Sequence, residues 1–138
     1  MLAGDRTEAA ARRLAHASAA ERDAQNRLGM LEQLQDEYSG RMNDQLVRGT
    51  SVHGWQNFNQ FMRKVGVAVD GQARLTGDAQ LRQQQAQQAW QQERQRQLSY
   101  EALAKRAALR QLKIEQKRDQ KAMDEFAANA ARCKASFG

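Results

Sequence analysis

The sequence has no proline among its 138 residues, a single cysteine and few aromatic side chains. Without proline, no residue forces a kink or an end on a helix, so the chain permits long uninterrupted helices. A lone cysteine excludes a disulfide within the chain and fits a reducing compartment. We interpret Cys133 as a small residue without a chemical role.

Long apolar runs are also missing. No run approaches the roughly 20 residues that a transmembrane helix needs, and the N-terminus lacks the apolar core of a signal peptide. We therefore expect a cytoplasmic protein with no direct membrane insertion.

Residues that carry catalysis or hold cofactors are sparse and scattered. His16 and His53 lie far apart in the sequence, and no Cys/His cluster has the spacing of metal ligands. No glycine-rich loop of the kind that cradles nucleotide phosphates is present. We therefore expect no catalytic residues, no cofactor, no metal and no enzymatic activity.

The residues that are present favour long helices. The chain is rich in Ala, Gln, Arg, Leu and Glu, which are strong helix formers. Its mean hydropathy of -0.88 leaves too little apolar surface for a thick core but enough for a narrow seam between two helices. The net charge of +6 suits nucleic acid, anionic lipid or an acidic protein surface, and charge alone does not choose among them.

A heptad pattern marks the first half of the chain. Alternating steps of three and four residues are typical of the contact positions of a coiled coil. The predicted seam of the first helix consists of Ala10, Leu14, Ala17, Glu21, Ala24, Leu28, Leu31, Gln35, Tyr38, Met42 and Gln45.

The pattern breaks around Gly49, where the sequence reads Arg-Gly-Thr-Ser. Gly49 is the expected helix stop, and Thr50, Ser51 and His53 are candidate N-caps of a second helix. A connection of about five to eight residues makes the two helices antiparallel neighbours. We therefore predict an all-α fold, a coiled-coil hairpin of residues 1–138 whose second helix is much longer than the first. Helix 1 spans about 5–47, the loop about 48–53 and helix 2 about 54–131.

The second helix carries its own apolar pattern, which we expect to fade beyond Ala79 in a glutamine-rich stretch. Because the helices run antiparallel, Phe58 and Phe61 should pack near Tyr38 and Met42. The predicted seam of this helix consists of Phe58, Phe61, Val65, Ala68, Gln72, Leu75 and Ala79.

The C-terminal third has no predicted partner within the chain. Its apolar pattern strengthens again at Tyr100, Leu103, Ala107 and Ile114. Residues 101–121 also hold seven cations against three acids, a local net charge of 7 − 3 = +4.

Two motifs resemble the FliJ family, small coiled-coil components of the flagellar type III export apparatus. The first is a Tyr about seventeen residues before a Trp, followed by W-x-N-[FY]-x-x-F, which here is Trp55 to Phe61 within WQNFNQFMRKV. The second is a terminal K-x-M-D-E-F block, which here is Lys121 to Phe126 within DQKAMDEFAANAARCK. The likeness spans about 14–134.

The resemblance implies a structural role in flagellum biogenesis and motility. Family members are antiparallel two-helix coiled coils that insert into the hexameric flagellar export ATPase and promote its assembly and activity. They bind the cytoplasmic region of the export gate protein and are credited with escorting export chaperones. A cytoplasmic protein of this kind is peripheral at the inner membrane through the export apparatus.

The resemblance also implies a gate-binding patch near the hairpin end. Leu31 and Phe61 are seam positions as well, so hairpin packing is their alternative role, whereas Leu34 sits one position off the seam. The patch comprises Arg27, Leu31, Leu34, Tyr38, Phe61, Val65, Ala68 and Gln72.

The contact with the ATPase ring is expected to involve the basic residues of the C-terminal third. Charge complementarity steers and orients such a contact more than it adds affinity. A plain solvated face is the alternative role for each of them. The set comprises Lys105, Arg106, Arg110, Lys113, Lys117, Arg118 and Lys121.

Two other functions are weighed against this one. The first is the equivalent stalk of a virulence-type injectisome, which usually lacks the terminal block and the Trp-x-Asn-aromatic start. The second is a basic helical protein that binds nucleic acid, which predicts aromatic and basic side chains interleaved on an exposed face. Most aromatics here fall on the predicted seam, so we expect no nucleic acid partner.

Overall fold

The chain forms two α-helices joined by a short turn. A computed structural model describes the backbone of residues 3–137: α1 spans Ala3–Arg48 (46 residues) and α2 spans Val52–Phe137 (86 residues). No strand occurs in this described range, so the predicted all-α fold with a much longer second helix is confirmed. The chain divides into two units, residues 1–94 and residues 95–138, and each is described by itself.

The turn between the helices is shorter than the sequence predicts. It contains only residues 49–51, because Gly49 takes a positive φ of 90° and its N–H donates to the carbonyl of Leu46 at 3.3 Å. Of the three candidate N-caps, Ser51 takes the role: its Oγ accepts the N–H of Gly54 at 3.1 Å, and its carbonyl accepts the N–H of Trp55 at 3.0 Å.

The second helix also ends later than expected. The sequence analysis places its end at about 131, whereas α2 continues to Phe137. The last residues contain no glycine or proline before Gly138, so nothing in them stops a helix. The hydroxyl of Ser136 donates to the carbonyl of Arg132 at 3.0 Å, one helical turn back.

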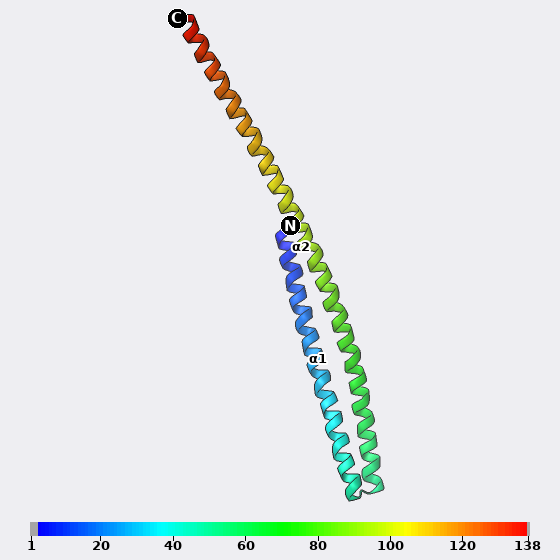
Figure 1. The fold of residues 1–138 in the computed structure, drawn as a ribbon. Helices are drawn as coiled ribbons and strands as arrows, with labels where there is room; N and C mark the ends of the chain where they lie inside the picture. The colour runs from blue at the N-terminus through cyan, green and yellow to red at the C-terminus, as the bar shows by residue number, and fades with distance from the viewer. Residues whose placement is uncertain (1–2, 138) are drawn as a thin grey trace. The chain divides into compact units, whose positions relative to one another are not determined.

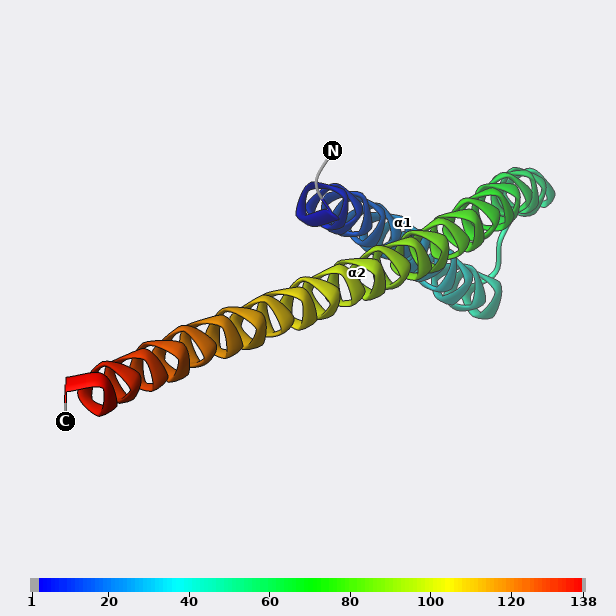
Figure 2. The same ribbon diagram turned by 90° about the horizontal axis from the view of Figure 1, so that it is seen from above.

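Residues 1–94 form the hairpin, in which α1 lies along the first part of α2 (Figure 1). Seen from above, the two helices cross (Figure 2), as expected for a pair whose contacts repeat every 3.5 residues. The hydroxyl of Thr7 donates to the carbonyl of Glu93 at 3.3 Å, and that of Thr76 reaches the carbonyl of Ala24 at 3.2 Å. Thr7 and Ala24 are separated by as many residues on α1 as Thr76 and Glu93 are on α2. The two helices therefore keep the same antiparallel register from one contact to the other.

The seam of α1 matches the sequence prediction except at Gln45, which is exposed. Small residues alternate with large ones from Ala10 to Leu28, and only large ones follow up to Met42. Ala10 and Met42 are each only 3% exposed. The confirmed positions, all buried or half-buried, are Ala10, Leu14, Ala17, Glu21, Ala24, Leu28, Leu31, Gln35, Tyr38 and Met42.

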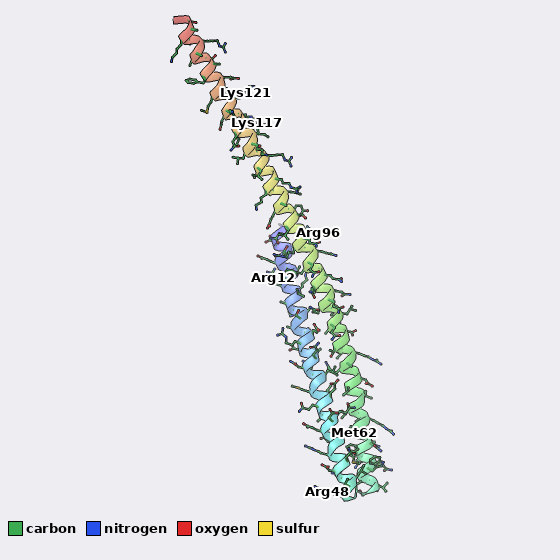
Figure 3. All side chains as sticks on the ribbon, viewed as in Figure 1. Arg12, Arg48, Met62, Arg96, Lys117 and Lys121 are labelled. Carbon is green, nitrogen blue, oxygen red and sulfur yellow. The ribbon has the colours of Figure 1, made fainter. Side chains whose placement is uncertain are left out.

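The seam of α2 is shifted at every second contact. Phe58, Val65, Gln72 and Ala79 are buried or half-buried as predicted, whereas Phe61, Ala68 and Leu75 are exposed. The residue that follows each of these three takes the seam position instead. These replacements are Met62, Val69 and Thr76; Figure 3 shows Met62 near the closed end of the hairpin.

Thr76 explains why hydropathy alone misplaces this seam. Thr76 is 5% exposed while the more apolar Leu75 is 59% exposed. The Thr76 hydroxyl is satisfied inside the seam, because it lies 2.8 Å from the carbonyl of Gln72 and 3.2 Å from that of Ala24. A buried hydroxyl with such partners carries no desolvation penalty large enough to expel it.

The seam of α2 does not fade beyond Ala79 as expected. It continues through Gln83, Ala86, Trp90 and Glu93, all half-buried. Their partners on α1 are mostly small, which lets the helices approach closely without large apolar side chains.

Substitution of Gly49 by Ala should destabilise the hairpin by about 1 kcal/mol, because an L-residue with a side chain is strained at positive φ. Gly40→Ala is the matched control with the opposite sign. Gly40 lies inside α1, and a Cβ there meets no atom within 4 Å, so Ala should stabilise the helix by about 1 kcal/mol. Urea unfolding followed by circular dichroism measures both. Equal effects of the two substitutions would contradict this account of the turn.

Candidate docking surfaces

The eight residues of the predicted gate patch do not share one environment. Val65 is only 6% exposed and therefore offers no surface to a partner. Three residues are half-buried in the seam: Leu31, Tyr38 and Gln72. The four that are exposed are Arg27, Leu34, Phe61 and Ala68.

An aromatic pair joins the two helices within this patch. The ring centroids of Tyr38 and Phe61 are 4.5 Å apart with an interplanar angle of 46°, so the predicted proximity of these residues is confirmed. The guanidinium of Arg41 lies 5.5 Å from the centroid of the Tyr38 ring. Phe61 is 38% exposed, so its ring contacts Tyr38 and still presents surface to solvent. Such pairs add roughly 0.5–1.5 kcal/mol beyond the area that they bury.

The exposed residues of the patch lie on one face of the hairpin. Arg27 and Leu34 each precede a seam residue of α1, and Phe61 and Ala68 each precede a seam residue of α2. In an antiparallel pair, side chains that precede equivalent seam positions on the two helices project from the same face. These residues therefore form one surface instead of being spread around the hairpin.

Leu75 belongs to the same face, although the sequence analysis assigned it to the seam. It precedes the seam residue Thr76 just as Phe61 and Ala68 precede Met62 and Val69, and it is 59% exposed. The heptad spacing from Ala68 to Leu75 was the signal that could have placed it here. We call this surface the lateral stripe. It consists of Arg27, Leu34, Phe61, Ala68 and Leu75, and the half-buried ring of Tyr38 adjoins it through its contact with Phe61.

All seven predicted ring-contact residues are exposed on α2 in the second unit. The helical period divides them, because Lys105 and Arg118 fall off the line that the others follow. The remaining five are spaced by three or four residues and share one side of the helix. We call them the basic stripe: Arg106, Arg110, Lys113, Lys117 and Lys121. Figure 3 shows the last two on this part of α2.

Large apolar side chains accompany the basic stripe. Every side chain described between Leu98 and Ser136 is exposed, so no residue of this segment is covered. Leu98, Leu109, Leu112 and Met123 share one side of the helix by the same period, next to the cations. Tyr100, Leu103, Ala107 and Ile114, where the sequence pattern strengthens, are exposed too. This segment thus offers both charge and apolar surface.

The described residues offer little for other kinds of site. No group of three or more His, Cys, Asp or Glu side chains among them is placed to hold a metal ion. None of the described helical segments combines the length and the apolar character that crossing a bilayer requires. Cys133 is a free, exposed thiol.

Comparison with known proteins agrees with the two motifs. The family model described as "Flagellar FliJ protein" matches residues 1–136. The chain belongs to the FliJ family. The FliJ motifs of the sequence therefore identified it correctly, and membership supports a role in the flagellar export apparatus.

Two curated FliJ relatives cover nearly the whole chain. The flagellar FliJ protein of Escherichia coli (strain K12) is 30% identical over 130 residues, which are 94% of this chain and 88% of the relative. The flagellar FliJ protein of Salmonella typhi is 29% identical over 130 residues, with the same coverage of each chain. No solved structure matches.

Proposed function

We propose that this FliJ-family chain is the non-enzymatic central stalk of a flagellar type III protein export apparatus. It inserts into the hexameric export ATPase, promotes assembly and activity of the ring, couples the ring to the export gate and escorts export chaperones. The observation that carries the proposal is the presence of two exposed surfaces of different chemistry in two different units. The lateral stripe belongs to residues 1–94 and the basic stripe to residues 95–138.

The lateral stripe suits the gate protein. It exposes aromatic and aliphatic side chains on a rigid helical pair, and arginines border it, which is the composition of interaction hot spots. Leu34 and Phe61 are its central anchors, because they are 37% and 38% exposed and this exposed part of each side chain can contact a partner. Val65 stays in the seam and supports the stripe without touching the partner.

The basic stripe suits a ring lined with acidic or polar loops. Its five cations repeat along one side of a single helix, so they present one charged face to the ring. Complementary charge would orient the helix in the ring, and the neighbouring leucines would supply the apolar contact. In the proposed function the ATPase hydrolyses ATP, and the stalk contributes only contacts.

The chain's place in the cell follows from these partners. A stalk between the ATPase and the gate is cytoplasmic and is held at the inner membrane by the export apparatus.

The direct test adds the purified chain to the flagellar export ATPase. At a saturating ratio it should raise the rate of ATP hydrolysis severalfold and shift the ATPase toward hexamers, while the chain alone releases no phosphate. Phosphate release and analytical ultracentrifugation measure the two effects. An unchanged rate and an unchanged oligomeric state of the ATPase would overturn the proposed function.

A further inference from the structure

The closed end of the hairpin exposes a cluster of apolar side chains. Val47 and Val52 flank the turn and are 88% and 72% exposed, and Leu46 and Trp55 are 48% and 41% exposed. Three of the four line a shallow surface hollow together with two residues of the turn. We call Leu46, Val47, Val52 and Trp55 the tip cluster.

The tip cluster is separate from the lateral stripe. Leu46 lies four residues after the seam residue Met42, which puts it on the flank of the seam opposite to Leu34. Trp55 lies seven residues before the seam residue Met62, so it stands at the end of the seam and not on the face of Phe61. The proposed gate contact therefore does not account for the apolar surface at the tip.

The charged Lys, Arg, Asp and Glu side chains between Gln45 and Val69 all have one sign. From Gln45 to Val69 the chain contains no Asp or Glu, although the whole sequence has 16 acidic residues. Three cations fall in this interval: Arg48, Arg63 and Lys64. Arg48 ends α1 at the closed end (Figure 3) and follows the exposed Val47 directly in the sequence.

We propose that the tip cluster docks on an anionic phospholipid surface. Two exposed valines at the apex would enter the boundary between headgroups and acyl chains. Trp55 would lie at headgroup level, which its amphipathic ring favours. The acid-free surroundings with Arg48, Arg63 and Lys64 would be attracted by the negative surface potential of such a membrane. Stable membrane contact needs two weak signals acting together, and the tip has an apolar one and a basic one.

A second copy of the chain fits the tip less well. A closed dimer is isologous, so each tip would face its own equivalent. The cations of the two acid-free intervals would then face each other, and their like charges would repel.

The lipid contact is interfacial and involves only the turn and its flanks. It goes beyond the proposed ATPase and gate contacts. It also goes beyond the sequence-based expectation, which placed the chain at the membrane only through the apparatus.

Vesicle binding by the full chain tests the proposal. Trp90→Phe leaves Trp55 as the sole tryptophan, since the chain has two. With vesicles of phosphatidylcholine and phosphatidylglycerol, the chain should co-sediment, and Trp55 emission should shift to the blue and be quenched by brominated acyl chains. Pure phosphatidylcholine vesicles should bind it much more weakly. Val52→Asp should weaken binding by about tenfold or more, because it removes an apolar contact and adds a like charge.

Leu81→Asp is the control, since Leu81 is a 54% exposed apolar residue of α2 that lies outside the acid-free interval from Gln45 to Val69. It should bind vesicles as the parent chain does, and circular dichroism should show equal helicity for both variants. Three outcomes would overturn the proposal. The first is the absence of binding to anionic vesicles. The second is binding without quenching of Trp55 emission, which is the result expected if the basic stripe holds the lipid. The third is self-association that Val52→Asp abolishes while vesicle binding is unaffected.

Discussion

Val65→Asp should destabilise the hairpin by about 3 kcal/mol or more. Val65 is 6% exposed in the seam of α2, where an introduced carboxylate would be removed from water. Its neighbours along the seam are Met62 and Val69, neither of which can pair with a negative charge. The expected result is a marked fall in the urea midpoint of unfolding, measured by circular dichroism at 222 nm, a wavelength that reports helix content.

Val67→Asp, two residues further on the same helix, is the control. It introduces the same aspartate at an exposed position, so it shows whether the loss of stability comes from burial of the charge. Val67 is 72% exposed, so the same change there should alter stability by no more than about 0.5 kcal/mol. If both variants unfold at the same urea concentration, the pairing of α1 with α2 described for residues 1–94 is wrong.

Leu34→Glu should abolish most binding to the export gate protein, with a loss of about tenfold or more, while the helices stay folded. Leu34 is 37% exposed and central in the lateral stripe, so a charge there would be desolvated by an apolar partner. Glutamate is a good helix former, so α1 should keep its helicity. A pull-down with the cytoplasmic region of the gate protein measures binding, and circular dichroism measures folding.

Leu81→Glu is the control for that measurement. Leu81 is 54% exposed on α2 and does not belong to the lateral stripe, so the same change should leave gate binding intact. Phe61→Ala should lower both gate binding and stability, because the Phe61 ring also contacts Tyr38. Gate binding by Leu34→Glu at the level of the parent chain would remove the lateral stripe as the gate contact.

The hairpin could be predicted because its determinants are local. Gly49 stops α1 and Ser51 caps α2. Most seam residues of α1 have no large apolar neighbour in the sequence that could take the seam position instead. In α2 this does not hold, since both residues of the pairs Phe61–Met62 and Ala68–Val69 are suitable for the seam. The partner helix decides between the two residues of such a pair, and the pattern of one helix does not contain that information.

The docking surfaces were harder to predict for the same reason. The family resemblance brought Val65 into the gate patch, but it does not tell a residue that contacts a partner from one that supports the contact. Leu75 was missed because an apolar residue near a heptad position resembles a seam residue until its exposure is known. The tip cluster does not follow the pattern of a single helix, since the turn brings together residues of two helices.

In the proposed function, one chain meets the ATPase ring and the export gate through different surfaces. The measurement that tests it most directly assays ATPase stimulation and gate pull-down side by side for two variants. Leu34→Glu should lose the gate and keep full stimulation. A combined Arg110→Glu, Lys113→Glu and Lys117→Glu variant should lose stimulation and keep the gate, because it reverses the centre of the basic stripe. If each variant loses both activities while remaining helical, the two surfaces do not act separately and the account is contradicted.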